Sequence, residues 1–555
     1  MAGTDVVDVL IAGAGPVGLT AAVELRRRGV DCRIVDRLPE RMPYAKAVGV
    51  QPRTLELWDR SGLVRAAVDA AVPMRGQLVF VDGAEQQRIE LALPPEVPYG
   101  FAALPQYETE RILEEFLARH GGRIERGTEL VSFVQDADGV TSRLVGADGR
   151  EQEVRSRFLV GCDGAHSTVR KGLGLSFEGG AFPEEYMLAD VEVDWDLPPG
   201  YGVRTTRRAA DGSTDLLVCI PLPGHKRYRV SMKVPPDLSA ARRSTGTGSG
   251  RAAVAHGLEG GDGPALADIQ AVLDRLSPRP TTASAMRWSS VFRISHRLVD
   301  RYGDGRVLVA GDAAHIHPPT GAQGMNTGIQ DAYNLAWKLA LAVDGSAHPD
   351  LVASYDAERR PVGEEVVGRT VRHATEGLPA EPVDPETVLL REAQLLVGYR
   401  ESPIVGPADG NGDRDGDGGG AAPRAGDRAP DCGGLTGPIA RYPQRLYDLL
   451  RDRDHVLLLA TTEDAPSDGF DELTDTAGEL TGHQITALAI LPDERPTDGL
   501  RLPAYRDGRG EFARAYGLRG PTAFVVRPDG YLGARLTPPT AGGLAEHLGR
   551  VFRPR

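Results

Sequence analysis

Apolar residues along this 555-residue chain follow several distinct patterns, and each pattern predicts a different kind of element. Residues 6–12 and 307–310 are nearly continuous apolar runs, which are typical of parallel strands buried on both faces. In the middle of the chain the alternating stretches QLVFVDG, YMLADVEVDW, DLLVCIPL and YRVSMKV predict half-buried strands. After residue 326 apolar side chains recur at helical spacing, at Ile329, Ala332, Leu335, Ala336, Leu339 and Ala340.

A glycine-rich turn follows the first apolar run. Gly13, Gly15 and Gly18 give the spacing G-x-G-x-x-G between a strand and a helix. The first glycine permits a tight turn, the second lets a pyrophosphate approach the backbone, and the third lets the helix pack closely on the strand. Pro16 and Val17 begin the helix, where the missing N–H of proline is not needed. The pattern predicts a dinucleotide at the helix N-terminus; a purely structural turn is the alternative.

Three strands of the pattern end in an acid. Asp36 follows the strand CRIV, lies 18 positions after Gly18 and precedes Arg37, and a carboxylate at this distance suits ribose hydroxyls. Asp163 and Asp312 follow two later strands. An NAD dehydrogenase needs no such second and third acids, whereas a long dinucleotide that extends across the sheet does. The three strand ends therefore predict FAD.

Three motifs resemble those of a known family. GAGPVGL, DGAHSTVR and GDAAHIHPPTGAQGMNTG are similar to stretches of the class A FAD-dependent aromatic monooxygenases, the para-hydroxybenzoate and phenol hydroxylase type, and most of all to bacterial aromatic polyketide hydroxylases. The resemblance implies that Asp36 binds the adenosine ribose and that Asp312, after Gly311, binds the ribityl chain. It implies further cofactor contacts from Asp163, Ser167 and Arg170, from Lys46, where arginine is commoner, and from Gln106, near the ribityl chain.

The loop of residues 305–328 is expected to hold the flavin ring. Reduced flavin carries negative charge around N1 and O2, and a helix N-terminus offers free N–H groups and a positive dipole end. We expect this helix to begin near Asn326, and glycines to let the backbone approach a flat ring. By the resemblance Pro318 lies against the flavin where oxygen reacts. The candidate catalytic residues are Pro318, Gly324 and Asn326, and Gly321 and Met325 complete the expected cofactor contacts; Ala322 stands where glycine is common in the family.

The chemistry implied by the resemblance belongs mainly to the cofactors. NADPH or NADH would reduce the flavin, and O2 would add at flavin carbon 4a to give a hydroperoxide. That hydroperoxide would hydroxylate a phenolic polycyclic substrate, a polyketide of antibiotic biosynthesis. The protein would exclude water and orient the substrate ring. Two alternatives stay open. One is a different flavin oxygenation, such as Baeyer–Villiger insertion, ring cleavage or inactivation of a rifamycin or tetracycline. The other is a flavin-binding scaffold without turnover.

Metal and dithiol chemistry are not expected. His315 and His317 form a His-x-His pair, but no further ligand completes a site apart from Asp312, so we expect both histidines to order the loop by hydrogen bonds. The acids at positions 413, 415 and 417 imitate the front of a calcium loop, yet the twelfth position is Arg424 and not Glu. The four cysteines form no Cys-x-x-Cys, which is typical of a reducing cytoplasm.

The patterns divide the chain into an α/β protein of three parts. We expect a discontinuous, Rossmann-like FAD-binding domain of residues 1–71, 100–176 and 283–400. A substrate-binding β-sheet domain of residues 72–99 and 177–282 interrupts it. The sheet face towards the flavin should be apolar to suit a polycyclic ligand. Trp288 and Phe292 are candidates either for this pocket or for ordinary core packing.

The C-terminal part follows a Gly-, Asp- and Pro-rich stretch, expected to be a flexible linker over residues 401–428. Residues 429–555 resemble the thioredoxin-like C-terminal domain of phenol hydroxylase and its relatives. They lack the Cys-x-x-Cys that redox work needs, so we expect a structural or association role. The hairpin of this domain should turn at Asp529-Gly530, and Pro521 before it is expected to be cis.

The net charge and the distribution of apolar residues indicate which partners the protein has. The formal net charge of −14 argues against nonspecific nucleic-acid binding. No apolar run reaches the length of a membrane span, and the N-terminus lacks the basic region of a signal peptide. We therefore expect a soluble cytoplasmic enzyme with a small-molecule substrate and O2 as partners, and a homodimer is the candidate assembly.

Overall fold

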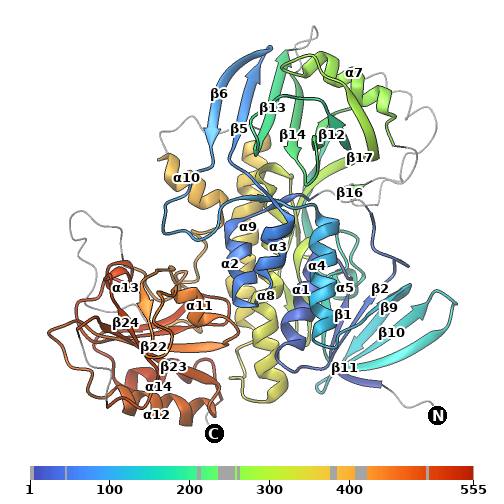
Figure 1. Ribbon diagram of the computed structural model, residues 1–555. Helices are drawn as coiled ribbons and strands as arrows, with labels where there is room; N and C mark the ends of the chain where they lie inside the picture. Colours follow the sequence, from blue (N-terminus) through green and yellow to red (C-terminus); the bar gives the residue numbers. More distant parts are fainter. Residues whose placement is uncertain are drawn as a thin grey trace.

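A computed structural model describes residues 5–43, 47–208, 214–234, 257–258, 263–375, 384–406, 422–494 and 499–553. Over these residues the chain has a mixed α/β fold in which the strands form three large sheets and one small one (Figure 1). This confirms the expected fold class.

The first sheet positions the strand ends that carry acids. Its parallel strands are arranged in the order β19, β11, β1, β2 and β8, and a β9–β10 hairpin and β18 extend it in antiparallel fashion. The carboxyl ends of β1, β2, β11 and β19 therefore meet at one edge. The strands are β1 (Asp5–Ala12), β2 (Cys32–Asp36), β8 (Ile124–Arg126), β9 (Thr128–Gln135), β10 (Val140–Gly146), β11 (Glu151–Gly161), β18 (Gly303–Asp304) and β19 (Val307–Val309).

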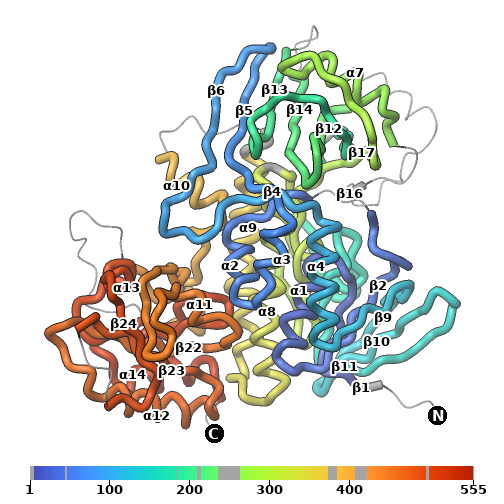
Figure 2. Tube along the Cα trace, viewed as in Figure 1, coloured from blue at the N-terminus to red at the C-terminus, as the bar shows by residue number. Residues whose placement is uncertain are grey.

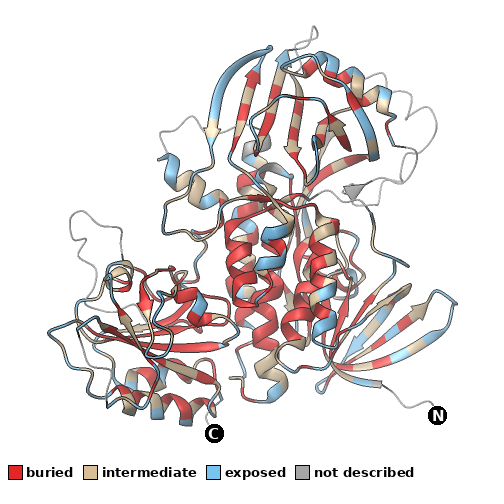
Figure 3. Ribbon diagram, viewed as in Figure 1, coloured by how far each residue is buried: buried red, intermediate tan, exposed pale blue. Residues whose placement is uncertain are grey.

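Helices cover this sheet, and α8 is largely buried among them. Its apolar face repeats at helical spacing, and Gly345 ends it in the left-handed conformation, with φ of 82°. Helices α1 and α8 pack against each other, and Figure 3 shows both as largely buried. The helices here are α1 (Pro16–Arg26), α2 (Pro52–Arg60), α3 (Val64–Ala70), α4 (Gln106–Arg119), α5 (Thr168–Gly172), α8 (Gly324–Asp344), α9 (Ser354–Thr375) and α10 (Pro385–Glu392), with short 3₁₀ turns at Gly311–Ala313 and Thr320–Ala322.

The second sheet lies at the top of Figure 1 and contains the four strands expected from alternation. Helix α7 covers one of its faces through a buried apolar cluster. Strands β12 and β17 pair along most of their length, and this ladder begins at Ala283, the first residue of the region expected to belong to the FAD-binding domain. The strands are β5 (Gly76–Val81), β6 (Ala84–Glu90), β12 (Phe177–Val193), β13 (Tyr201–Arg208), β14 (Thr214–Pro221), β15 (Arg227–Lys233), β16 (Gly257–Leu258), β17 (Ala283–Val299) and β20 (His315–Ile316), with α7 at Leu266–Leu276; the small sheet is β3 (Gly49–Val50), β7 (Ala102–Ala103) and β4 (Val72–Pro73).

The third sheet forms the C-terminal part of the molecule, drawn at the red end of the colour bar in Figure 2. Its order is β21, β24, β23, β22, β25, β26, in mixed orientation. The elements are β21 (Leu435–Thr436), α11 (Leu446–Leu450), β22 (His455–Ala460), α12 (Phe470–Thr481), β23 (Ile485–Pro492), β24 (Ala504–Asp507), α13 (Glu511–Ala515), β25 (Thr522–Val526), β26 (Leu532–Leu536) and α14 (Ala541–Leu548).

Two expectations for this part can be compared with the structure. The hairpin between β25 and β26 turns at Asp529-Gly530 as expected, with φ of 75° at Gly530. The expected cis bond before Pro521 is wrong: the cis bond found in the described residues is Thr537-Pro538. Pro521 instead leads directly into β25, where extended trans backbone continues the chain into the sheet. The calcium-like acids and most of the expected linker lie outside the described residues.

The four cysteines are free thiols, and three of them are buried. Burial raises the pKa of each thiol, to about 11 for Cys32. Within the described part of the chain, no helix is both long enough and apolar enough to cross a membrane.

Candidate active site

The three glycines of the β1–α1 turn serve different needs. A Cβ on Gly13 would lie 2.3 Å from the carbonyl oxygen of Cys162, and one on Gly18 would lie 1.9 Å from that of Gly13. Both glycines are thus required by packing within the protein. A Cβ on Gly15, in contrast, would meet no atom within 4 Å. Gly15 faces open space at the N-terminus of α1, where a pyrophosphate would need to approach the backbone.

The start of α1 connects this turn to the other parts of the site. Pro16 occupies the first helical position. Val17 packs against two further glycines, because a Cβ on Gly311 would lie 2.8 Å from Val17 Cγ2 and one on Gly328 would lie 2.7 Å from it. The close approach of these backbones brings the β1 turn, the β19 turn and α8 together.

Asp36 is fixed beside the glycine turn. Its Oδ2 accepts a hydrogen bond from the Ala14 backbone N–H at 2.6 Å, and its Oδ1 accepts from Leu38 at 2.8 Å. The side chain is only partly buried, and Arg37 next to it is exposed. A carboxylate is therefore held at the strand edge, next to the open face of Gly15. Lys46, the other candidate from this part of the chain, lies outside the described residues.

The residues after β11 contact mainly the protein itself. Asp163 Oδ2 accepts from the N–H groups of Thr168 and Val169, at 2.7 and 3.2 Å, and burial raises its pKa. Its Oδ1 is buried and accepts no hydrogen bond from the described residues, which leaves an acceptor open to a ligand. Ser167 caps α5 by accepting from the Arg170 N–H at 2.9 Å.

Arg170 braces two of the strand-end turns. Its guanidinium donates to the carbonyl oxygens of Ala165 and Ala313, at 2.8 and 3.2 Å, and lies 3.9 Å from the ring centre of Phe177. The Arg170 side chain is thus buried between the β11 and β19 turns. Its expected contact with FAD or NADPH remains a prediction.

The β19 turn holds Asp312 by means of a buried carboxylate from α8. Gly311 has φ of 61°, and its N–H donates to Asp331 Oδ2 at 3.2 Å. The same Oδ2 lies 2.7 Å from His315 Nε2, and Asp331 Oδ1 accepts from Arg359 Nε at 2.7 Å. Burial opposes ionisation of Asp331, but the charges of Arg359 and His315 outweigh it and lower the pKa of the carboxyl. Asp312, partly buried, follows Gly311 in this fixed turn.

Both histidines of the His-x-His pair make the expected contacts that order the loop. His315 bonds to Asp331, and His317 Nδ1 lies 2.8 Å from the carbonyl oxygen of the buried Pro318. Among the described residues, no group of three or more metal-ligating side chains is found.

Helix α8 starts at Gly324, two residues before the expected position. Gly321 and Ala322 precede it with φ of 70° and 55°, left-handed conformations that interrupt the helical path and let a new helix begin directly after them. This backbone explains why glycine suits position 322. No side chain caps the first turn of α8, which contains the partly buried Met325. Its N–H groups are thus available to a negatively charged ligand.

The side chain of Asn326 is fully occupied by the protein. Its Oδ1 accepts from the Gln51 N–H at 2.9 Å and from Thr54 Oγ1 at 2.8 Å. Its Nδ2 donates to the carbonyl oxygens of Gly49 and Ala322, at 2.9 and 2.8 Å. The side chain therefore links the start of α8 to β3 and α2, and only the Asn326 backbone belongs to the open first turn.

Gln106 begins α4, and a buried acid orients its side chain. Gln106 Nε2 donates to Glu110 Oε1 at 2.8 Å. Burial raises the pKa of Glu110 to about 7. Ionisation of Glu110 therefore changes the charge next to the side chain expected near the ribityl chain.

One face of the second sheet carries a buried ion pair. Arg229 donates to both oxygens of Asp190, and Trp288 Nε1 donates to Asp190 Oδ2 at 2.9 Å. Ile220 is the cross-strand partner of Arg229 and packs with Val48 of the segment before β3. This face lies opposite α7 and packs against the segment before β3. It combines the ion pair with the apolar cluster of Leu188, Phe292 and Ile294, and the apolar face expected towards the flavin remains a prediction.

Sequence reasoning did not identify the buried residues that support the site, namely Gln51, Thr54, Glu110, Asp190, Arg229, Asp331 and Arg359. For Asp331 a signal existed, because a charged residue interrupts the apolar face of α8 between Ile329 and Ala332. Neither Arg359 nor Arg229 lies near its partner in the sequence, so no local pattern identifies them.

The described geometry is that of a dinucleotide-binding oxidoreductase with an open helix start at the far end of the site. A family model described as FAD binding domain matches residues 6–370, and the chain belongs to this family of FAD-binding proteins. The fit of the residues to FAD rests on the open face of Gly15, the unpaired Asp163 Oδ1 and the uncapped start of α8.

Similar proteins specify the class further. The chain is 33% identical to a "Flavin-dependent monooxygenase" of Mycobacteroides abscessus, over 98% of this chain and 99% of the relative. It is also 33% identical to the "6-methylpretetramide 4-monooxygenase" of Streptomyces rimosus, over 95% and 90%. The solved flavin-dependent monooxygenase PieE, in complex with FAD and substrate, superimposes with a TM-score of 0.78 at 26% identity and covers 99% of this chain and 100% of its own. The protein is an FAD-dependent monooxygenase.

Proposed function

We propose that this enzyme hydroxylates a phenolic polycyclic compound of the aromatic polyketide type, with O2 as the oxygen source and NADPH or NADH as the reductant. The observation that carries the proposal is the convergence of three acidic strand ends and the uncapped start of α8 on one edge of the first sheet. The relative from Streptomyces rimosus, named for action on 6-methylpretetramide, supports the polycyclic class.

Each part of FAD would have its own contacts. Asp36 would bind the adenosine ribose, and the Gly15 backbone with the N-terminus of α1 would bind the pyrophosphate. Asp312 would bind the ribityl chain. The ring would lie over Pro318 and the first turn of α8. When bound, the flavin supplies the redox and oxygen-transfer chemistry.

The protein itself would contribute electrostatics and orientation. The open N–H groups at Gly324–Asn326 and the dipole of α8 favour negative charge on the adjacent part of the ring. Trp288 and Arg229 lie on the sheet face opposite α7 and would orient an oxygen-bearing aromatic substrate. We propose that the sheet face opposite α7 is the one that contacts the substrate. The domain boundaries expected from the sequence and a homodimer are also part of this proposal.

The proposal is tested with the purified full chain. Reconstitution with FAD should give a yellow protein whose NADPH oxidation accelerates when a phenolic polycycle is added, and whose product is one oxygen atom heavier than the substrate. Asp312→Ala should weaken FAD binding about tenfold or more, since a charge-assisted hydrogen bond to the cofactor is lost. A colourless protein that cannot be reconstituted would overturn the proposal.

The product distinguishes hydroxylation from its alternatives. Carbon NMR of the product should show a new phenolic or tertiary alcohol carbon with the ring system intact. A lactone would instead indicate Baeyer–Villiger insertion. FAD binding without ligand-stimulated NADPH oxidation would indicate a scaffold.

A further inference from the structure

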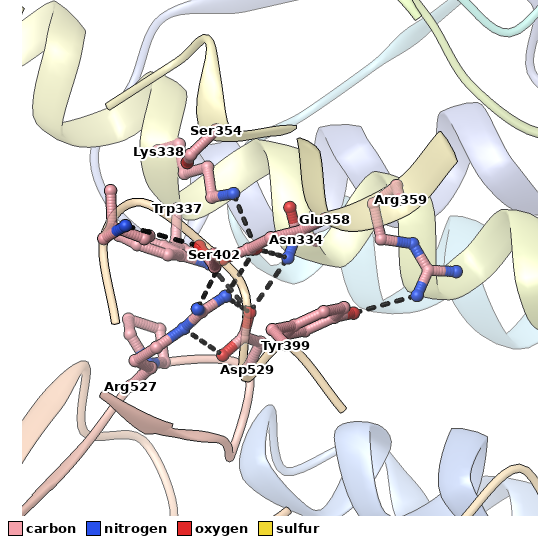
Figure 4. Close-up of polar contacts among 12 residues, drawn as sticks. Asn334, Trp337, Lys338, Ser354, Glu358, Arg359, Tyr399, Ser402, Arg527 and Asp529 are labelled. Carbon is pink, nitrogen blue, oxygen red and sulfur yellow. Dashed lines mark hydrogen bonds and ion pairs between the residues drawn. The ribbon is translucent and has the colours of Figure 1, made fainter. Parts of the chain in front are cut away.

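The turn of the β25–β26 hairpin is buried, although turns usually run over the protein surface. We call residues 527–531 the hairpin tip. Arg527, Asp529 and Tyr531 are each exposed by 2% or less. The hairpin tip comes from the third sheet and contacts α2, α8 and α9 of the flavin-binding part. Figure 4 shows its Arg527 and Asp529 beside residues of α8 and α9.

On one side, the hairpin tip forms a closed set of ion pairs with α9. Arg527 donates to both carboxylate oxygens of Glu358, at 2.6 and 2.8 Å. It also donates to both oxygens of Asp529, at 3.0 and 2.6 Å. The guanidinium is thus shared between an acid of the hairpin tip and an acid of α9, as Figure 4 shows.

The same acids accept hydrogen bonds from three buried residues of α8. Asn334 Nδ2 and Trp337 Nε1 each donate to Asp529 Oδ2 at 3.2 Å. Lys338 Nζ donates to Glu358 at 2.8 Å. Because these side chains are all buried, water cannot replace any lost partner.

On its other side, the hairpin tip contacts α2. Arg53 donates to the carbonyl oxygen of Asp529 and lies 4.6 Å from the ring centre of Tyr531. Arg60 Nε donates to the carbonyl oxygen of Pro528 at 2.8 Å. The hairpin tip therefore links α2 to α8 at one point.

A second link between the same helices lies at the flavin end of α8. There Asn326 Oδ1 accepts from the Gln51 N–H and from Thr54 Oγ1, which belong to the start of α2. Asn326 and Trp337 are separated by about 16 Å along the helix axis, at ~1.5 Å per residue. Two links at this separation fix both the distance and the angle between α2 and α8.

We propose that the hairpin tip is a positioning element of the flavin site. It holds α2 and α8 so that Gln51, Thr54 and Asn326 keep the first turn of α8 in the place where the flavin ring lies. The proposal rests on the proposed function for the identity of the ligand. It gives the C-terminal part, which lacks a redox Cys-x-x-Cys, a role in the oxygenation reaction.

The main test compares two buried acids of the C-terminal part in the full-length holoenzyme. Asp529→Asn removes the negative charge of the hairpin tip, which lies beside Arg527. Asp507→Asn is the matched control, because Asp507 is also buried but caps α13, accepting from the Ala513 N–H at 2.9 Å. We expect Asp529→Asn to weaken FAD binding about tenfold, to shift the flavin absorption bands and to lower kcat more than it raises the KM for NADPH. Asp507→Asn should leave all three within twofold of the parent, whatever it does to Tm.

A double-mutant cycle tests the route through α2. Thr54→Val removes one hydrogen bond to Asn326, and Asp529→Asn removes the distant link. If both act on the same helix pair, the fall in FAD affinity of the double variant differs from the product of the single effects by threefold or more. Independent, multiplying effects would overturn the proposal.

A milder variant decides the question if Asp529→Asn does not fold. Arg53→Lys keeps a positive charge beside Glu56 but loses the guanidinium fork that reaches the hairpin tip. It should weaken FAD binding by about threefold with the same spectral shift. Parent-like FAD binding and spectra in folded Arg53→Lys, and in Asp529→Asn where it folds, would overturn the positioning role. Failure of the parent to bind FAD would overturn the proposed function itself.

Discussion

The two halves of α8 differ in whether their polar groups have partners within the protein. In the first turn, Gly324–Asn326, no side chain caps the helix, and the preceding backbone passes through two left-handed residues. Further along, Asn334, Trp337 and Lys338 are buried, and each donates to a carboxylate. The first half leaves its backbone donors for a ligand, and the second half is closed by other parts of the protein.

This contrast shows how one helix can both bind a ligand and hold its own position in the protein. Open donors at a helix start lower the cost of placing negative charge there, whereas paired buried charges fix the helix in position. The same contrast separates Gly15, whose added Cβ would meet nothing, from Gly18, whose added Cβ would meet backbone. Changing an open group should therefore affect ligand binding with little loss of stability, whereas changing a closed group should lower stability, whether or not it also affects binding.

The largest effect is expected in the closed half. Glu358→Ala leaves Lys338 without its carboxylate and Arg527 with one acid instead of two. Removal of one member of a buried charge set costs about 3–5 kcal/mol. Urea denaturation at neutral pH measures this loss. Glu364→Ala, on the exposed side of the same helix, should change the free energy of unfolding by less than ~0.5 kcal/mol.

The next effect should distinguish Gly15 from Gly18. Gly18→Ala should cost about 3 kcal/mol of stability in the absence of FAD, because its Cβ overlaps the Gly13 carbonyl oxygen. Gly15→Ala should leave the Tm of the apoprotein unchanged and weaken FAD binding about tenfold, because only the ligand is displaced. Thermal unfolding and FAD titration of both variants make the comparison. A stability loss at Gly15 equal to that at Gly18 would contradict the open and closed assignment.

A pH effect is expected at Glu110, which lies next to Gln106. Burial raises the pKa of Glu110 in the folded state to about 7, above its ordinary value of 4.5. Between these two values the folded state binds more protons than the unfolded state, so the stability contribution falls as the pH rises from 4.5 to 7. The fall should be on the order of 2 kcal/mol. Glu110→Gln should flatten the curve of unfolding free energy against pH in this window, and an unchanged slope would contradict the assignment.

The smallest effect is expected at Ala322, two residues before α8 begins. Ala322→Gly removes left-handed strain and should stabilise the protein by about 0.5 kcal/mol. Ala66→Gly, at an exposed position with ordinary helical backbone in α3, should instead destabilise by about 1 kcal/mol. Chemical denaturation measures the change in unfolding free energy of each variant. Changes of opposite sign would confirm that the backbone at residue 322 suits glycine.

The parts of the site whose residues lie close together in the sequence are the ones that could be predicted. Gly13, Gly15, Gly18 and Asp36 lie within one strand–helix–strand unit, so their spacing alone carries the information. The start of α8 was placed within two residues because apolar side chains repeat after it. The paired roles of His315 and His317 in ordering the loop were also predictable, since no other ligands accompany them.

The closed contacts between segments that are distant in the sequence could not be predicted. Arg527 and Glu358 are 169 positions apart, and Asn326 and Gln51 are 275 apart. A local pattern cannot indicate which of many charged residues will meet. For the same reason the ion pair between Asp190 and Arg229, which lie on different strands of the second sheet, could not be predicted.

The state of the four cysteines has a consequence for the lifetime of such an enzyme. A reduced flavin exposed to oxygen is a source of hydrogen peroxide, and peroxide attacks sulfur mainly as the thiolate. Burial keeps all four sulfurs protonated, because it raises the pKa of each one. The oxidant that escapes from an unproductive cycle would therefore meet no ready target among the cysteines, and the catalyst would resist self-inflicted damage at those sites.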